Sequence, residues 1–317
     1  MFFGTGAEVC AQARAEGLEL LEPTMGALVR HLQAATDGFD PATHHEATPH
    51  DRHGWMDPNI MWVFTKLGAS AAAAAAPLLL VEVGSWKGQS SCAFAKRLKS
   101  LGDGHRLVCI DTWLGAPEFW TWGLLDRSRG GSLRPRFGLP TVYYTFLANV
   151  FRQGLQGVVA PLPISSVQGA QVLAHYGCAA DAVYVDGAHE HDAVLADLNA
   201  YWPLVRPGGV IFGDDYCAEW PGVVAAVEAF AAARRLSVEV RGIVWFVSKP
   251  AADAECAAGV PVACRPGDGA VEACATTDDR GSRRQHERRS FASGLVLGAS
   301  LAAGAGLLLA RRAVTCR

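Results

Sequence analysis

The chain has 317 residues, of which 50% are hydrophobic and 19% are charged, and its net charge is −3. A chain of this length and composition can bury a large core in one or two domains. The acidic balance argues against a nucleic-acid surface, where Lys and Arg must be in excess. Nine cysteines without a C-x-x-C pair are typical of reduced thiols rather than of a disulfide framework.

Residues 1–77 are expected to form a helical extension that could act as a lid. Apolar residues recur at helical spacing between Leu18 and Leu32, and a second helical pattern runs from Trp55 to Leu67. Histidines are frequent between these two patterns, and they could also close over a site: His44, His45, His50 and His53.

From residue 78 the pattern changes to alternating strands and helices. Short apolar runs, as expected for strands buried on both faces, occur at 78–83, 106–110, 158–162, 182–185 and 209–212. Helical stretches separate most of these runs, at 89–101, 141–153, 167–175, 191–204 and 223–233. The alternation predicts a doubly wound parallel sheet. Two further β-rich runs, 236–240 and 243–248, are separated by only two residues, which permits only an antiparallel hairpin.

The predicted fold class is therefore α/β, with a Rossmann-like seven-stranded sheet over residues 78–250 that is parallel except for the terminal hairpin. Residues 251–290 show no hydrophobic period and are expected to be a disordered linker. Residues 291–310 carry no charge and would form a hydrophobic helix of about 30 Å, enough to cross a bilayer. Arginines bracket the run, which predicts a single-pass tail anchor, and the five arginines between Arg280 and Arg289 keep the globular domain on the cytosolic side; a helix docked on that domain is the alternative.

The segment 81–91 closes the first strand, turns on glycines and opens a helix. In doubly wound sheets the ligand lies outside the carboxyl ends of the strands, where this turn is expected. Gly84 would let the backbone approach a cofactor, and Gly88 would let the helix pack closely. The G-x-x-x-G spacing departs from the G-x-G-x-x-G pattern of dinucleotide sites.

Polar residues follow the second and third strands as well. Asp111 ends the second strand, where a carboxylate can accept hydrogen bonds from both hydroxyls of a ribose, or simply cap a turn. Ser165 and Ser166 follow the third strand and could contact an adenine edge, but a helix N-cap explains them equally well.

Carboxylates collect after the fourth and fifth strands. Asp186 follows the fourth strand, and Asp214 and Asp215 follow the fifth, so all three are expected at one edge of the sheet. Three close carboxylates repel one another unless a cation neutralises them, and Mg²⁺ is the usual ion; helix capping is the alternative. His189 is the hypothesised general base and His191 the reserve candidate, although either could be a solvent-facing residue at a helix start.

Residues 112–140 form an insertion after the second strand. Aromatic residues and arginines on a loop above the predicted site suggest a lid that contacts an acceptor, and a lid packed on its own tryptophans fits as well. The residues concerned are Trp113, Phe119, Trp120, Trp122, Arg127, Arg129, Arg134 and Arg136.

Together, the motifs at 81–91, Asp111, 186–189 and 213–216 resemble those of class I, cation-dependent small-molecule O-methyltransferases. The catechol type is similar, and the type that methylates the sugars of macrolides and aminocoumarins is especially so. The resemblance covers about residues 78–250. There are two departures: Asp215 stands where the catechol type has Asn, and Ala188 stands where some sugar enzymes have an aspartate.

The resemblance implies S-adenosylmethionine as the cofactor and specific roles for the motif residues. Glu82, Gly84 and Ser85 would line its methionine end, Asp111 would hold its ribose, and Trp86, Ser165, Ser166 and Asp186 complete the expected contacts. Asp186, Asp214 and Asp215 match the Mg²⁺ ligands. His189 falls where the catechol enzymes keep a lysine base.

The expected function is Mg²⁺-assisted methyl transfer to a hydroxyl of a small molecule. The expected partners are that acceptor, a membrane and a second copy of the chain in a homodimer, with no nucleic acid. The sequence leaves open the acceptor's identity and the choice between O- and N-methylation. The alternatives are a nicotinamide-dependent oxidoreductase, disfavoured by the glycine spacing and the hairpin, and a membrane-anchored cofactor-binding module without turnover.

Overall fold

A computed structural model describes residues 24–44, 56–73, 77–121 and 133–251. All of these belong to one compact unit, Met1–Val262, and none to the second unit, Ala263–Arg317. No helix within the described ranges is long and apolar enough to span a membrane. The predicted tail anchor and linker from residue 252 onward lie outside these ranges, as do His45, His50, His53, Trp122, Arg127 and Arg129.

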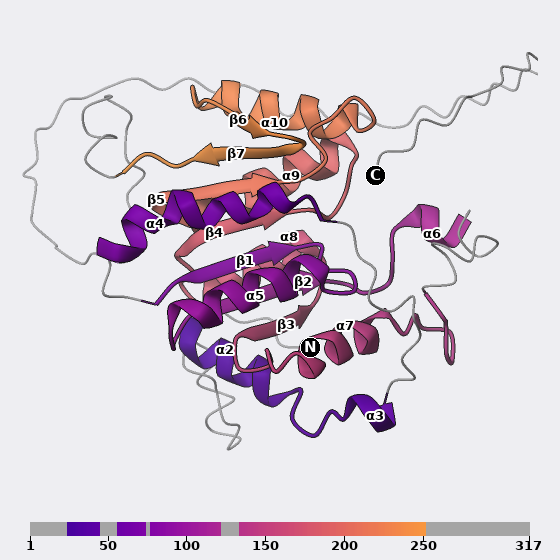
Figure 1. The fold of residues 1–317 in the computed structure, drawn as a ribbon. Coiled ribbons are helices and arrows are strands. Elements are labelled where there is room, and N and C mark those ends of the chain that lie inside the picture. The colour runs from indigo at the N-terminus through magenta and orange to yellow at the C-terminus, as the bar shows by residue number, and fades with distance from the viewer. Residues whose placement is uncertain (1–23, 45–55, 74–76, 122–132, 252–317) are drawn as a thin grey trace, which may run out of the picture. The chain divides into compact units, whose positions relative to one another are not determined.

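Seven strands form one sheet in the order β3-β2-β1-β4-β5-β7-β6 (Figure 1). The parallel strands are β1 (Leu79–Val83), β2 (Arg106–Asp111), β3 (Val159–Pro163), β4 (Ala180–Val185) and β5 (Val205–Gly213). The hairpin of β6 (Glu239–Arg241) and β7 (Val244–Ser248) continues the sheet antiparallel to β5. The predicted sheet with its terminal hairpin is confirmed, and the strand order reverses between β1 and β4, where ligands bind in folds of this kind.

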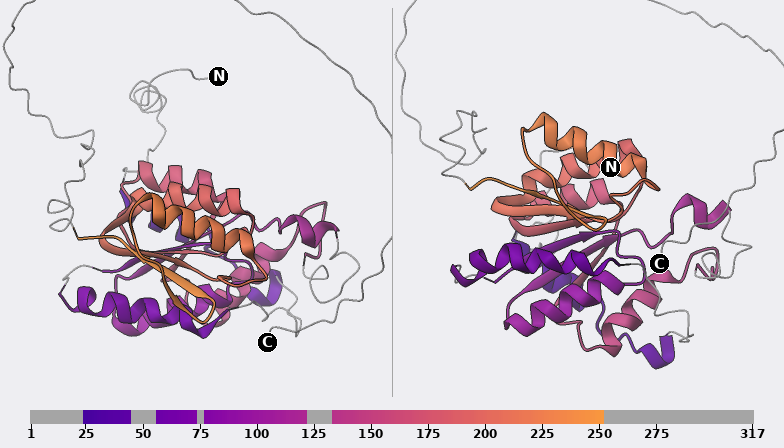
Figure 2. Two further views of the ribbon diagram at one scale, coloured as in Figure 1. Left: turned by 90° about the horizontal axis from the view of Figure 1, so that it is seen from above. Right: turned by 45° about the horizontal axis from the view of Figure 1, so that its top comes forward.

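Helices cover both faces of the sheet because every central strand is apolar on both sides. On β1, Val81 and Val83 belong to one core cluster and Leu80 to the other. Figure 2 shows the two layers on opposite faces of the sheet. One face carries α4 (Val63–Ala73), α5 (Gln89–Leu101) and α7 (Val142–Arg152), and the other carries α2 (Met25–Ala34), α8 (Ser166–His175), α9 (His191–Tyr201) and α10 (Pro221–Ala233).

Short helical segments complete the described fold: α3 (Pro41–His44), η2 (Pro58–Trp62), α6 (Pro117–Thr121) and η4 (Trp202–Leu204). The N-terminal extension thus contributes two longer helices, α2 and α4, to opposite faces of the sheet.

Several predicted boundaries differ from the structure by a few residues. The helix expected over 191–204 ends at Tyr201, because Pro203 lacks an N–H donor and the next turn is a 3₁₀ helix. Strand β5 begins at Val205 rather than at 209, with a register shift that accommodates the extra residues. The hairpin turn lies one residue later than expected and includes Gly242, whose φ of +63° suits a tight turn.

Candidate active site

The turn after β1 lies directly against the end of β4. Gly84 has a φ of +88°, and a Cβ at this position would overlap the carbonyl oxygen of Asp186. The Gly84 N–H donates to the carbonyl of Ile110 on β2 (2.9 Å), and the Asp186 N–H donates to that of Val83 (2.8 Å). Only glycine fits here, and its backbone brings together the ends of three strands.

Glu82 holds this turn from inside the protein. Its carboxylate is fully buried and accepts hydrogen bonds from the hydroxyls of Ser85 (2.9 Å), Ser90 (2.5 Å) and Ser91 and from the thiol of Cys109 (3.3 Å). Burial raises the pKa of Glu82, and these donors oppose the shift. The structure therefore places the side chains of Glu82 and Ser85 in an internal hydrogen-bond network behind the turn, and their contact with a cofactor stays a prediction.

Asp111 faces the same turn from the end of β2. Its Oδ2 accepts the N–H of Trp86 (2.8 Å) and its Oδ1 the N–H of Trp113 (2.7 Å). Burial raises the pKa of Asp111, while these backbone donors lower it. The backbone N–H groups of Ser85 and Thr112 also lower the pKa of Asp111, so a ribose hydroxyl would share the carboxylate oxygens with four backbone donors. The Trp86 indole stacks on Phe119 of α6, with the ring centroids 4.7 Å apart.

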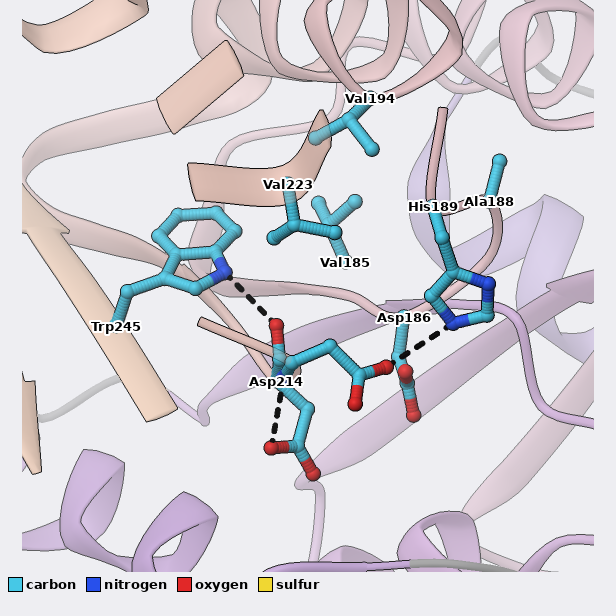
Figure 3. Close-up of a pocket in the computed structure, with 9 residues that line it drawn as sticks. Val185, Asp186, Ala188, His189, Val194, Asp214, Val223 and Trp245 are labelled. Atoms are coloured by element: carbon cyan, nitrogen blue, oxygen red, sulfur yellow. Dashed lines mark hydrogen bonds and ion pairs between the residues drawn. The ribbon is translucent and has the colours of Figure 1, made fainter. Parts of the chain in front are cut away.

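Two of the three predicted metal-binding aspartates lie together with His189. One possible ligand atom from each of Asp186, His189 and Asp215 lies within 4.8 Å of the other two (Figure 3). His189 Nε2 is 3.0 Å from Asp215 Oδ2, and the Tyr184 hydroxyl donates to Asp186 Oδ2 (3.0 Å). Burial raises the pKa of Asp186 well above its usual value, and the charges of the two neighbouring aspartates add to this. Among the described residues, no positively charged side chain contributes to this shift.

Asp214 lies beside this group, but its carboxylate has other partners. Oδ1 accepts the N–H of Asp215 (2.9 Å), and Oδ2 accepts the N–H of Asp57 (3.2 Å), just before η2. Its carbonyl accepts the indole N–H of Trp245 (3.2 Å). Burial raises the pKa of Asp214 to about 6. The structure thus brings Asp186, His189 and Asp215 together and ties Asp214 to the backbone of the N-terminal extension.

A small pocket lies between the acidic group and apolar side chains of β4, β7, α9 and α10. Its polar wall is formed by Asp186, His189, Asp214 and Asp215, and its remaining lining is Val185, Ala188, Val194, Val223 and Trp245 (Figure 3).

Sequence reasoning missed the residue that packs on His189. The indole of Trp220 stacks on the imidazole, with ring centroids 3.9 Å apart and an interplanar angle of 19°. Trp220 immediately precedes Pro221, which begins α10, so a tryptophan at a helix start soon after Asp215 was the available signal. The reserve candidate, His191, instead contacts Asp192 (2.8 Å) with a side chain that is 43% exposed.

Ser165 and Ser166 lie at the start of α8. The Ser165 hydroxyl bonds to Gln168 (2.8 Å) and makes no capping hydrogen bond to the backbone. The carbonyl of Ser166 accepts the Tyr201 hydroxyl (2.7 Å), and its side chain hydrogen-bonds to Asp197, which is buried on α9. The first turn of α8 is therefore fixed by α9.

Replacing Asp197 by Asn should stabilise the protein at neutral pH. Burial raises the pKa of Asp197 to about 6 from 3.8. The protonated Asp197 therefore makes its full contribution to the unfolding free energy below pH 3.8, and this contribution is lost as the pH rises through 6 and the buried group ionises. The difference in unfolding free energy between variant and wild type should grow with pH across this window, by at most about 3 kcal/mol. Urea denaturation at pH 5, 6 and 7.5 measures it, and a difference independent of pH would contradict the assignment.

The described part of the insertion after β2 contains both core and partly exposed aromatic residues. Trp113 is buried, contacts the rings of Tyr143 and Phe146, and donates its indole N–H to the carbonyl of Trp86 (2.7 Å). It therefore belongs to the core. Trp120 is partly exposed, and its indole N–H bonds to the carbonyl of Leu114 (2.8 Å).

Part of the chain matches a known protein family. Residues 81–216 match a family model described as a methyltransferase domain. No curated protein sequence matches the chain. Similar solved structures include the O-methyltransferase NovP (19% identity, 61% of this chain and 78% of that one, TM-score 0.43) and CalS11, a TDP-rhamnose 3'-O-methyltransferase of calicheamicin biosynthesis (14%, 61% and 80%, 0.39). An O-methyltransferase from Bacillus cereus, in complex with SAH, is 16% identical over 76% of this chain and 97% of that one (TM-score 0.40).

These structural similarities are too distant to assign an activity. The family match covers the turn after β1 and the aspartates that follow β4 and β5. The strand order with its terminal hairpin is that of a class I fold. Residues 81–216 are therefore a methyltransferase domain.

Proposed function

We propose that this chain transfers the methyl group of S-adenosylmethionine to a hydroxyl of a small molecule with the help of a divalent cation, for which the sequence predicts Mg²⁺. The main support is the contact between the Gly84 turn and the Asp186 carbonyl. It puts the turn expected to bind the cofactor beside the group expected to bind the cation. Methyl transfer is an in-line displacement, so donor and acceptor must be held side by side.

The chain's own residues mainly position the reactants. Asp111 would orient the ribose, while the turn at Gly84, which packs against the Asp186 carbonyl, would contact the methionine end. Asp186 and Asp215 would hold the cation, and the raised pKa of Asp186 fits a carboxylate that lacks a compensating charge. A bound cation would lower the pKa of a coordinated acceptor hydroxyl. The predicted ligand role of Asp214 would require its carboxylate to turn away from Asp57.

His189 has two possible roles in this proposal. As the predicted general base, it would accept the proton of the acceptor hydroxyl, which requires a free ring nitrogen. Its Nε2, however, is the atom that faces Asp215, and it lies where an ion could be held. One nitrogen lone pair cannot bind a proton and an ion at once.

The test is methyl transfer from isotopically labelled S-adenosylmethionine to pools of sugars, phenols and lipid head groups. We expect an O-methylated product whose formation falls to background in EDTA and returns with added Mg²⁺ or Mn²⁺. Full activity in EDTA would point to transfer without a metal, and label on nitrogen to N-methylation. Binding of a nicotinamide cofactor instead would favour an oxidoreductase, and S-adenosylmethionine binding without transfer would favour a binding module.

We also propose that residues 291–310 anchor the protein in a membrane, with the methyltransferase domain on the cytosolic side. The support is a run of uncharged residues long enough to span a bilayer, between Arg288-Arg289 and Arg311-Arg312. The full-length protein should stay in carbonate-washed membranes, whereas a chain that ends at residue 290 should not. Release of both chains by the wash would contradict the anchor.

A further inference from the structure

The cluster at the ends of β4 and β5 contains a nitrogen as well as carboxylate oxygens. His189 Nε2, rather than a carboxylate of Asp214, completes the set of close ligand atoms with Asp186 and Asp215. Asp214 keeps both its oxygens on the N–H groups of Asp57 and Asp215. The available donors are therefore two carboxylates and one imidazole, not three carboxylates.

The imidazole of His189 is held in this orientation by several contacts. Trp220 covers one face of the ring, with centroids 3.9 Å apart, and Asp215 Oδ2 lies 3.0 Å from Nε2. The backbone of α10 also packs closely on His189, because a Cβ at Gly222 would overlap the His189 carbonyl oxygen. A ring constrained in this way loses little conformational freedom when it binds an ion.

The choice of donors affects the choice of ion. Mg²⁺ is a hard cation that is bound almost entirely by oxygen and keeps several of its waters. Imidazole nitrogen favours first-row transition ions, whose affinity for nitrogen and oxygen sites rises from Mn²⁺ towards Cu²⁺. Replacing one carboxylate by an imidazole also lowers the negative charge of the set, which weakens its attraction for a hard cation.

We infer that His189 is a metal ligand and that Asp186, His189 and Asp215 select a first-row transition ion, such as Mn²⁺, over Mg²⁺. The inference rests on the proposed use of a divalent cation, and it replaces the predicted Mg²⁺ and the predicted role of His189 as a base. A ring nitrogen engaged with the ion is not available to the acceptor's proton.

The test measures ion binding, not turnover. Full-length protein, freed of metal by chelation and desalting, is titrated calorimetrically with Mn²⁺ and separately with Mg²⁺, without cofactor or acceptor. We expect Mn²⁺ to bind at least about tenfold more tightly than Mg²⁺. Pulsed electron paramagnetic resonance of the bound Mn²⁺ should show coupling to a coordinated imidazole nitrogen.

Two matched variants separate the role of His189 from general effects. His189→Asn replaces the ring nitrogen by an amide oxygen as the possible metal ligand. The nitrogen coupling should disappear, and the affinities for Mn²⁺ and Mg²⁺ should then agree within about threefold. His191→Asn makes the same change two residues later, on an exposed side chain. It should alter neither the nitrogen coupling nor the Mn²⁺ preference. S-adenosylmethionine binding, measured in parallel, verifies that each variant is folded.

Three results would overturn the inference: equal affinity for the two ions in the wild type, absence of nitrogen coupling, or an unchanged ion preference in His189→Asn. If His189→Asn loses turnover but keeps the Mn²⁺ preference and coupling, the histidine is the base and not a ligand. Failure of the wild type to bind S-adenosylmethionine would instead refute the proposed function, so the two failures are distinguishable.

Discussion

Replacing Gly84 by alanine should abolish S-adenosylmethionine binding. The new Cβ would overlap the carbonyl oxygen of Asp186, and it would do so on a backbone whose φ is +88°. The Asp186 carbonyl cannot move away easily, because the Asp186 N–H donates a hydrogen bond to the Val83 carbonyl and the preceding strand β4 is paired with β1. We expect at least about a 100-fold loss of affinity, equivalent to about 2.7 kcal/mol, by calorimetric titration.

Gly138→Ala is the matched control for this experiment. Gly138 has nearly the same φ, +86°, but no atom lies within 4 Å of the position of its Cβ. This variant should suffer only the backbone cost of about 1–2 kcal/mol in folding stability and keep its cofactor affinity. If Gly84→Ala also binds the cofactor normally, the turn after β1 is not the cofactor site.

The sheet could be predicted from the sequence because its signals are local. Strands buried on both faces are expected to be continuous apolar runs, and residues 182–185 meet this condition without reference to the rest of the chain. The hairpin also followed from the length of the connection alone, since a two-residue connection is too short to join two parallel strands. The strand ends then placed Asp111 and Asp186 at one edge of the sheet, as their positions after β2 and β4 require.

The directions of the site side chains could not be predicted in the same way. Asp214 and Asp215 are adjacent in sequence, yet only Asp215 faces His189, because its φ is +64° and Asp214 is engaged by the N–H of Asp57, 157 residues away. Neither the rare backbone conformation nor so distant a contact leaves a pattern in the sequence. Glu82 is a similar case, since only the fold shows that its partners are the hydroxyls of α5.

Asp111→Asn should weaken S-adenosylmethionine binding by about 10- to 100-fold, because a hydrogen bond to a charged group contributes about 1.5–3 kcal/mol. The amide keeps the size of the carboxylate but offers one acceptor oxygen instead of two. The carboxylate also holds the N–H groups of Trp86 and Trp113, so a loss of affinity alone would not show what Asp111 contacts. Asp192→Asn, the same change on a fully exposed side chain, should have no effect.

A ligand that lacks the ribose hydroxyls separates the two roles of Asp111. With S-adenosylhomocysteine and its 2′,3′-dideoxy analogue, the wild type should lose affinity when the hydroxyls are removed, whereas Asp111→Asn should lose much less. Such non-additivity is expected only if the carboxylate and the hydroxyls are in contact. If the two losses instead add, Asp111 acts solely by holding the backbone of Trp86, and the ribose must be bound by other residues.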